Sequence, residues 1–264
     1  MRANLKKFVM LFILVACVII LFDKISYSSE INKKNFYHEL SKRLSKNRAD
    51  YSNLSNEEFA NFRAVISTGI TTGKLYRSSS PVKAWGNRDI ISDNAANKAG
   101  VKTFINLADS EKDLKARKNF NQKYYSRQKF ICLNLNLKFK SKNFQNALAR
   151  GFKFMAENDP PFLIHCDLGK DRAGLFCALI ECLAGASADE VVNDFMISFY
   201  NYFGIIKNSD EYEFIADNEI KPFLASILEV KNIYDVNLYN AAEKYFLKIG
   251  VSQNEINTLR QKLK

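Results

Sequence analysis

The hydrophobic and polar positions of this chain follow two different periods, which predict strands and helices in alternation. Residues 131–137 alternate strictly between apolar and polar side chains, as a half-buried strand does. Residues 101–107 are β-branched and apolar enough for a buried strand, and residues 162–165 are a short apolar run directly after Pro160-Pro161. With a further short strand over residues 74–77, the pattern predicts a central sheet.

Helices are predicted where apolar residues recur every three or four positions. One such helix has Ser141 as its cap, and Pro160-Pro161 stops the chain after it. Its apolar face carries Phe144, Leu148, Phe152 and Met155. Residues 173–184 are apolar nearly all round, with Glu181 as the one charged residue, and predict a buried central helix that ends at Gly185.

Three capping boxes of the form Ser-x-x-Glu mark further helix starts, at Ser55, Ser187 and Ser252. They predict a brief helical turn after residue 55, a helix through Phe199, and a last helix over residues 253–263. Strands that alternate with helices, followed by a helical C-terminal part, are typical of the α/β class. The expected fold is therefore a single α/β domain with one sheet between helices.

The first thirty residues carry the pattern of an export signal. A basic segment precedes residues 8–22, a stretch without any charged side chain. This arrangement is typical of a secretory signal, and the stretch is short for a membrane-spanning helix, which needs about 20 apolar residues. Ser26 and Ser28 supply the small residues of a cleavage site after residue 28. The sequence therefore predicts an extracytoplasmic protein, whether secreted or anchored to the outer face of the cytoplasmic membrane.

Two alternatives to cleavage are an uncleaved membrane anchor and a lipoprotein lipidated at Cys17. The apolar run continues over residues 18–22 beyond Cys17, which is unusual for a lipoprotein. We divide the chain into residues 1–28 as signal peptide or anchor, residues 29–54 as a polar lead-in, and residues 55–264 as the folded domain.

Composition and charge narrow the classes of function. Hydrophobic residues make up 47% and charged residues 25% of the 264 residues, which excludes a mainly disordered chain. The formal net charge of +11 favours a polyanionic partner, but no nucleic-acid-binding motif accompanies it. Two histidines exclude a zinc hydrolase of the H-E-x-x-H type, and five cysteines without a C-x-x-C pair argue against a zinc ribbon or a thioredoxin-like site.

Candidate chemistry is concentrated in residues 162–174, FLIHCDLGKDRAG, where Cys166 and Arg172 are separated by five residues. A strand that turns through a glycine-containing loop into a helix directs backbone N–H groups inward and forms a nest for a phosphate-sized anion. These amides favour the thiolate form of Cys166. Arg172 can bind two phosphoryl oxygens at once. Gly169 permits the tight turn, and we expect Gly174 to let the helix pack against the sheet.

The stretch resembles the H-C-x5-R active-site loop of the protein tyrosine and dual-specificity phosphatases, and H-C-x-x-G-K-D-R is closest to their bacterial tyrosine/phosphoinositide branch. Further matches to that branch are Asn61-Phe62-Arg63, residues 73–79 with the letters LYRS, residues 100–107 and residues 194–198. The resemblance covers about residues 55–264. It implies a phosphatase catalytic domain with a mixed, mostly parallel sheet flanked by helices.

The resemblance also implies a mechanism without metal or cofactor. Cys166 would form a phosphocysteine intermediate while Arg172 and the loop amides stabilise the phosphoryl charge. Either Asp109 or Asp171 would be the general acid, and Asp109 is favoured because it follows the end of a strand and can overhang the loop. The substrate-binding residues expected in the loop are Asp167, Leu168, Gly169, Lys170, Ala173 and Gly174. The implied substrate is a phosphorylated protein, lipid or inositol, and Lys170 suits polyanionic head groups such as phosphoinositides.

One residue departs from the family pattern. Ala173 stands where the family usually has Ser or Thr, whose hydroxyl eases departure of the cysteine in the second step. We therefore expect lowered turnover that Ala173→Thr would raise. The alternatives are a non-hydrolytic phosphate-binding module and a sulfurtransferase, although the latter usually has a shorter loop between Cys and Arg.

Several neighbouring residues are expected to be structural. His165 is expected to fix the loop backbone, and Arg63 and Arg77 to brace the loop or to pair with Asp171. The aromatic run over residues 199–203 is expected to pack between helices rather than to line a phosphotyrosine pocket. The cysteines expected to be buried in the core are Cys132, Cys177 and Cys182.

Overall fold

The computed structural model describes residues 30–264, which fall into two compact units. In the smaller unit, residues 30–42 are helical, so the described part of the predicted lead-in begins with a helix. The predicted signal peptide or anchor over residues 1–28, with its lipoprotein alternative at Cys17, lies outside the described residues. Within residues 30–264, no helix has both the length and the apolar character that crossing a membrane requires.

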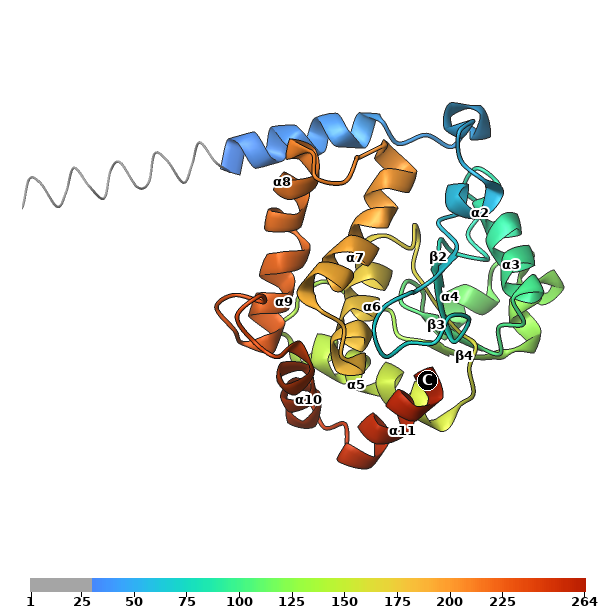
Figure 1. The fold of residues 1–264 in the computed structure, drawn as a ribbon. Helices are drawn as coiled ribbons and strands as arrows, with labels where there is room; N and C mark the ends of the chain where they lie inside the picture. Colours follow the sequence, from blue (N-terminus) through green and yellow to red (C-terminus); the bar gives the residue numbers. More distant parts are fainter. Residues whose placement is uncertain (1–29) are drawn as a thin grey trace, which may run out of the picture. The chain divides into compact units, whose positions relative to one another are not determined.

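The larger unit, residues 46–264, is built around one five-stranded sheet in the order β1-β2-β5-β3-β4 (Figure 1). β1 runs antiparallel to β2, and every other neighbouring pair is parallel. The strands are β1 (Arg63–Ala64), β2 (Leu75–Ser78), β3 (Thr103–Asn106), β4 (Lys129–Cys132) and β5 (Phe162–His165). The predicted α/β class with a mixed, mostly parallel sheet is confirmed.

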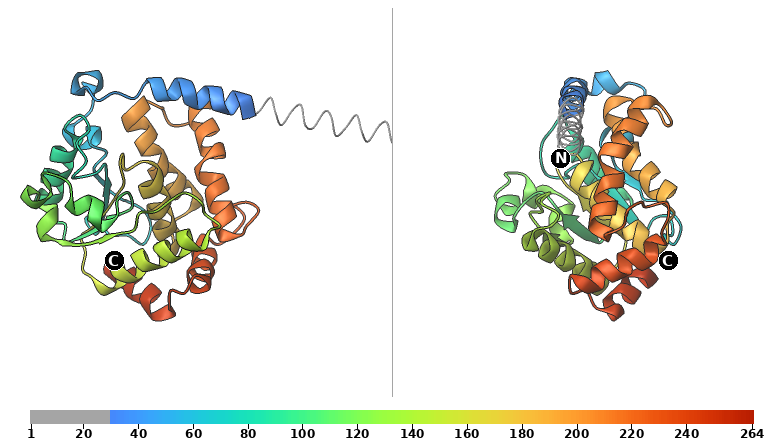
Figure 2. Two further views of the ribbon diagram at one scale, coloured as in Figure 1. Left: turned by 180° about the vertical axis from the view of Figure 1, so that it is seen from behind. Right: turned by 90° about the vertical axis from the view of Figure 1, so that its left-hand side faces the viewer.

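Helices and short 3₁₀ turns surround this sheet. Those before β5 are η1 (Arg48–Tyr51), α2 (Asn56–Phe59), α3 (Arg88–Lys98), α4 (Glu111–Lys115), η2 (Phe120–Gln122), η3 (Tyr125–Arg127) and α5 (Lys142–Glu157). Those after β5 are α6 (Asp171–Ala184), α7 (Ala188–Phe203), α8 (Asp210–Asn218), α9 (Ile220–Leu228), α10 (Leu238–Lys248) and α11 (Gln253–Leu263). Both views in Figure 2 show α10 and α11, in red, together at one end of this unit.

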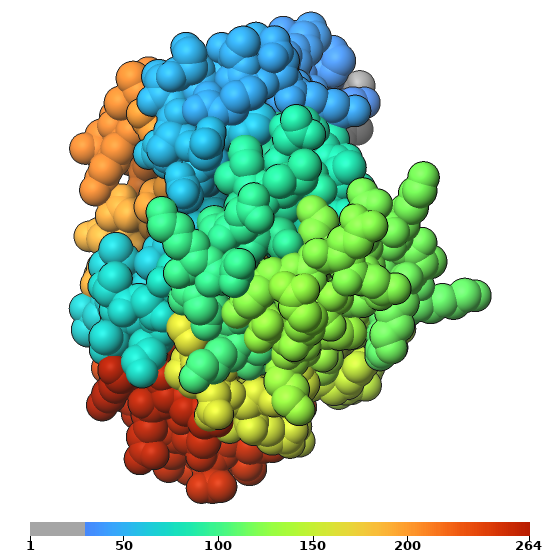
Figure 3. Space-filling view, turned by 90° about the vertical axis from the view of Figure 1, so that its right-hand side faces the viewer, coloured from blue at the N-terminus to red at the C-terminus, as the bar shows by residue number. Residues whose placement is uncertain are grey.

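Both faces of the sheet are buried. On one face, Phe104 of β3 and Leu163 of β5 belong to a core shared with α3, and the Phe104 ring stacks on Tyr125 with centroids 4.3 Å apart. The surface above this core is formed by α3 and by residues 111–130, teal and green in Figure 3. On the other face, α6 packs directly against β5 and β2. Every residue of β5, the central strand, is therefore buried, as expected for a strand covered on both sides.

The serine caps form as predicted. Ser55, Ser187 and Ser252 each accept a bond from the glutamate amide three residues on, and each glutamate side chain bonds back to the serine amide. Ser141 caps α5, and Gly185 ends α6 in the left-handed conformation. Local side-chain chemistry therefore sets these helix ends.

The strand predicted over residues 131–137 is wrong in its bounds, because β4 ends at Cys132. Asn134 adopts a φ of 43°, which breaks the extended conformation. Leu133 and Leu135 are nevertheless buried, and their amides donate to the carbonyls of Asn106 and Leu107. The alternating pattern therefore reflects alternating burial beside the end of β3 rather than a continued strand.

Candidate active site

The loop of residues 166–170 connects β5 to α6 at the carboxyl end of the parallel strands. In the register of the sheet, His165 at the end of β5 lies between Ser78 of β2 and Asn106 of β3. Residues that follow these two strands therefore flank the loop. Open α/β sheets bind their ligands at this edge.

Two carbonyl groups at the start of the loop are bonded away from its centre. The carbonyl of Asp167 accepts from the amide of Ser80 at 3.1 Å. The carbonyl of Leu168 accepts from Asn61 Nδ2 at 3.1 Å and from the hydroxyl of Tyr202 at 2.7 Å. Asn61, Ser80 and Tyr202 were not predicted as site residues, although Asn61 lies in a quoted family motif and Tyr202 in the aromatic run.

The next two carbonyls are held by Arg77. Its Nη2 donates to the carbonyl oxygen of Gly169 at 2.8 Å and to that of Lys170 at 2.9 Å. Four consecutive carbonyls of the loop are thus directed outward into protein. The amides between them face the other way, which is the arrangement of an anion nest.

Arg77 is fully buried and belongs to a cluster that anchors the loop to α7. Asp194 of α7 accepts from Arg77 Nη1 at 2.6 Å and from Arg63 Nε at 3.1 Å. Burial alone would raise the pKa of Asp194, but the two guanidinium groups outweigh it and hold that pKa below its ordinary value. The alternative in which Asp171 pairs with these arginines is wrong, because Asp194 takes that place. The alternative in which Arg77 braces the loop agrees with the structure.

Neither Gly169 of the loop nor Gly174 of α6 has room for a side chain. Gly169 has a φ of +68°, and a Cβ there would lie 2.2 Å from the carbonyl of Ser78. A Cβ at Gly174 would lie 2.6 Å from Arg77 Nη2 and 2.7 Å from the ring of Phe195. Arg77 belongs to β2, so Gly174 does let α6 pack against the sheet as predicted, and it also makes room for Phe195 of α7.

Cys166 and His165 are both buried at the start of the loop. His165 Nε2 lies 3.2 Å from the hydroxyl oxygen of Tyr125. Burial lowers the pKa of His165 to about 4, so the imidazole is neutral at pH 7. The hydrogen-bond partner of the neutral ring is Tyr125, and positive charge near Cys166 comes from elsewhere.

Arg172, in the first turn of α6, has its guanidinium directed back to the start of the loop. Its Nη2 lies 2.7 Å from Asp167 Oδ2, and its Nη1 donates to the carbonyl of Leu107 at 3.3 Å. Asp167 Oδ1 lies 2.8 Å from Lys83 Nζ. Lys83 follows β2 and was missed by sequence reasoning, because nothing local links it to a residue 84 positions away.

The two candidate acids have different surroundings. Asp109 is only 7% exposed and accepts from Arg117 and, at 3.1 Å, from Asn106 Nδ2. The side chain of Asp171 is 46% exposed and accepts from Lys170. The amide of Leu107 donates to the carbonyl of His165 at 2.9 Å, so the segment that carries Asp109 runs beside the loop.

Most of the aromatic run of α7 packs inward, as predicted, but Tyr200 is exposed, and the run also touches the loop. Phe199 and Tyr202 are buried. The Nζ of Lys170 lies 4.3 Å from the ring centroid of Phe199, within range of a cation–π contact.

The other described cysteines are free thiols. Cys177 and Cys182 are buried, as predicted, whereas Cys132 is only partly buried, so the prediction of burial is wrong for Cys132. Burial raises the pKa of Cys132 to about 12 and raises those of Cys177 and Cys182 as well. These three residues stay protonated at pH 7.

Residues 54–264 match the family model described as the tyrosine phosphatase family, which is most of the chain. The chain belongs to the tyrosine phosphatase family. This confirms the family identified from the H-C-x5-R loop.

Similar proteins include a tyrosine-protein phosphatase from Nostoc commune, 30% identical over 122 residues. That alignment covers 42% of this tyrosine phosphatase family member and 42% of the relative, so the chain spans less than half of the relative's length. Among solved structures, the core catalytic domain of the PP-IP phosphatase SIW14 from S. cerevisiae, in complex with citrate, has 18% identity and a TM-score of 0.36. It covers 58% of this chain and 87% of its own. A second structure of the Siw14 catalytic core has 17% identity, a TM-score of 0.36 and coverage of 60% and 91%.

Proposed function

We propose that the chain is a cysteine-dependent phosphomonoester hydrolase that works through a phosphocysteine intermediate. The observation that carries this proposal is the loop between β5 and α6, whose four outward carbonyls leave a nest with Cys166 at one end and Arg172 at the other. A nucleophile, inward amides and a guanidinium around one anion-sized site suit the transfer of a phosphoryl group.

The reaction has two steps. In the first, the Cys166 thiolate attacks phosphorus in line, an S–P bond forms, and the bond to the leaving oxygen breaks. A general acid gives its proton to that oxygen, and Arg172 exchanges the Asp167 carboxylate for two equatorial phosphoryl oxygens. In the second step water attacks phosphorus and gives a proton to the carboxylate that served as the acid. The S–P bond breaks, inorganic phosphate is released, and the thiolate is regenerated.

Asp109 is the proposed general acid. It is buried, and its segment is bonded to the end of β5, beside the nucleophile. The alternative, Asp171, is more exposed, and each carboxylate is paired with a cation, Asp109 with Arg117 and Asp171 with Lys170. Protonation of the leaving oxygen matters most for a poor leaving group, so the two aspartates can be separated by the substrate used.

The proposed substrates are phosphotyrosine and phosphoinositides or inositol phosphates. The name of the Nostoc commune relative supports the first class. The cationic side chain of Lys170, within the loop, supports the second. We also propose an extracytoplasmic location, which rests on residues 1–28 alone and is tested by protease accessibility in intact cells.

One observation favours a second candidate function. Ala173 lacks the hydroxyl that the family usually has after the arginine, so the site would bind phosphate without completing turnover. The remaining alternative, a sulfurtransferase, predicts a persulfide on Cys166 after treatment with thiosulfate.

The test measures phosphate release by the full chain in detergent with chelator present, against aryl phosphates, phosphotyrosine peptide, phosphoserine peptide, phosphoinositides and inositol phosphates. We expect turnover that Cys166→Ser abolishes. Asp109→Asn should slow alkyl phosphates by about 100-fold or more and leave activated aryl phosphates far less affected, as loss of a general acid does. Asp171→Asn is the matched control with the same change of charge.

Two results would contradict the proposal. Phosphate binding without release from any substrate would favour the binding module. A selective loss of activity on alkyl phosphates in Asp171→Asn rather than in Asp109→Asn would exchange the two aspartates.

A further inference from the structure

Three charged side chains form a chain of ion pairs at the rim of the loop. Lys83 Nζ lies 2.8 Å from Asp167 Oδ1, and Asp167 Oδ2 lies 2.7 Å from Arg172 Nη2. The side chains of Lys83 and Asp167 are 44% and 38% exposed, and that of Arg172 is 21% exposed. Burial alone would raise the pKa of Asp167, but Lys83 and Arg172 together hold it below its ordinary value, so the carboxylate is ionised.

The backbone fixes where Lys83 lies. The carbonyl of Asp167 accepts from the amide of Ser80, which ties the segment after β2 to the loop. The hydroxyl of Ser80 in turn accepts from the amide of Lys83 at 3.1 Å. Lys83 is thus held beside Asp167 by backbone bonds as well as by its own charge.

This arrangement creates an electrostatic conflict when a phosphoryl group binds. Arg172 must leave Asp167 to hold the phosphoryl oxygens, and Asp167, the residue directly after Cys166, is then left beside a dianion. A carboxylate without a counter-ion at that distance would repel the phosphoryl group. Lys83 is the second cation bonded to the same carboxylate, on the oxygen that Arg172 does not use.

We propose that Lys83 is a positioning residue for this site: it keeps the Asp167 carboxylate neutralised and turned aside when Arg172 moves to the phosphoryl group. The inference rests on the proposed phosphatase function. Lys83 acts through Asp167 and makes no contact of its own with the substrate. Removing Asp167 therefore removes the need for Lys83.

The experiment is a double-mutant cycle on the full chain. Lys83→Met, Asp167→Asn and the double variant are compared for the dissociation constant of inorganic phosphate by calorimetry, and for KM and kcat on an aryl phosphate. Lys83→Met should weaken phosphate binding by about fivefold, the scale of one partly exposed ion pair, and raise KM by more than it lowers kcat. The effect should shrink at high salt.

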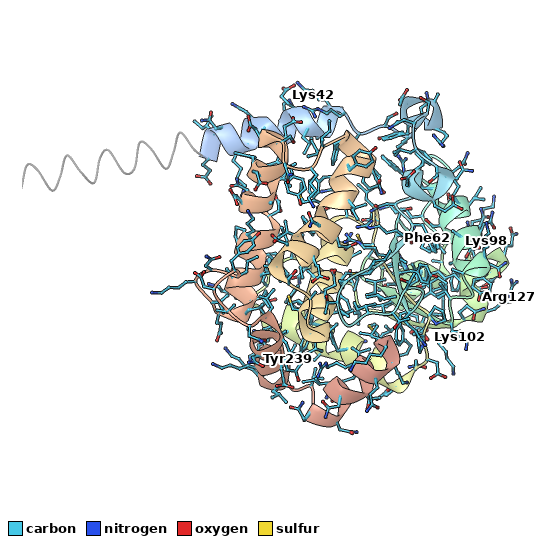
Figure 4. The ribbon with its side chains drawn as sticks, viewed as in Figure 1. Lys42, Phe62, Lys98, Lys102, Arg127 and Tyr239 are labelled. Carbon is cyan, nitrogen blue, oxygen red and sulfur yellow. The ribbon has the colours of Figure 1, made fainter. Side chains whose placement is uncertain are left out.

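Two control variants are matched to Lys83→Met. Lys83→Arg keeps the charge and should bind phosphate like the wild type. Lys102→Met removes the same charge before the start of β3, at the end of the sheet opposite the loop. Lys102 lines a cavity there together with Arg127 (Figure 4). This variant should leave phosphate binding unchanged.

The outcomes separate this inference from its alternatives. Phosphate affinity restored by adding Asp167→Asn to Lys83→Met would support the positioning role. A double variant whose phosphate affinity is as low as that of Lys83→Met would overturn the inference and make Lys83 a direct substrate ligand. A Lys83→Met variant that binds phosphate like the wild type would also overturn it. Calorimetry measures the phosphate dissociation constants of all four proteins even if no substrate is hydrolysed. Failure of the proposed phosphatase function would therefore appear separately, in the phosphate-release assay.

Discussion

Ala173 occupies the position directly after Arg172, in the first turn of α6, and its side chain is fully buried. Ala173→Ser adds a single oxygen in the first turn of α6, close in sequence to the loop. In the proposed mechanism this hydroxyl would donate to the Cys166 sulfur as the phosphoenzyme breaks down and would stabilise the departing thiolate. A hydrogen bond to a charged group contributes about 1.5 kcal/mol, so we expect Ala173→Ser to raise the rate of phosphoenzyme breakdown by about tenfold.

Rapid-mixing kinetics check this prediction, because they separate the burst of leaving group from the steady-state rate. Ala178→Ser is the matched control, since Ala178 is equally buried on the same helix but lies farther from the loop. If Ala173→Ser left both phases unchanged, or if both variants changed them alike, the hydroxyl would have no specific effect on the second step.

Sequence distance separates the site residues that could be predicted from those that could not. Cys166 and Gly169 lie in the loop and Arg172 follows in the first turn of α6, so their spacing in the sequence is enough to predict an anion site. Tyr202 and Asn61 hold the same loop from 34 and 107 residues away, and no local pattern marks a hydroxyl or an amide that will meet a carbonyl. Their roles follow from the packing of α7 and of the segment before β1 against the loop.

At the scale of elements, α3 shows why the pattern of apolar positions fails to predict some helices. The helix is polar in sequence, yet several of its charged side chains are buried. The guanidinium of Arg88 lies 3.6 Å from the ring centroid of Phe59, and Asp93 accepts from the amides of Tyr124 and Tyr125. Burial achieved through such specific partners leaves no apolar periodicity, whereas α5 and α6 have apolar faces and are predictable.

The turn between β5 and α6 gives a prediction at this scale. Gly169→Ala should abolish phosphate binding and hydrolysis, because its Cβ would lie 2.2 Å from the carbonyl carbon of Ser78 and 2.2 Å from its oxygen. β2 and the loop would have to separate, and the nest would lose its shape. The measurement is phosphate affinity by calorimetry, together with the urea midpoint of unfolding.

Gly100→Ala is the matched control. Gly100 has a φ of +65°, close to the +68° of Gly169, but nothing lies within 4 Å of its added Cβ. Both variants share the backbone strain of about 1–2 kcal/mol, and only Gly169→Ala adds the clash. Equal phosphate affinities in the two variants would show that the clash is relieved and that the nest tolerates a side chain.

At the scale of the whole molecule, two groups near the sheet respond oppositely to pH. Burial lowers the pKa of His165 to about 4, so the unfolded chain binds more protons and stability falls as the pH drops from about 6.5 to about 4. Glu181 of α6 is fully buried, and burial raises its pKa well above the ordinary 4.5. For Glu181 the folded chain keeps the proton that the unfolded chain loses, so its contribution to stability falls as the pH rises above about 4.5.

Removing the ionisation of Glu181 should therefore stabilise the protein increasingly toward high pH. In the wild type, ionisation of Glu181 stabilises only the unfolded state, which lowers the free energy of unfolding by up to about 1.4 kcal/mol per pH unit while the folded state stays protonated. In Glu181→Gln this loss is absent. Urea unfolding at pH 5 and pH 8 should show a small difference between variant and wild type at pH 5 and more than about 1 kcal/mol at pH 8. Glu190→Gln serves as the control of opposite sign, because amides and hydroxyls of Ser187 and Thr68 outweigh burial and lower the pKa of Glu190 to about 2. Glu190→Gln should lower the free energy of unfolding by the same amount at pH 5 and at pH 8. If Glu181→Gln also lowered it equally at both pH values, Glu181 would be ionised inside the fold.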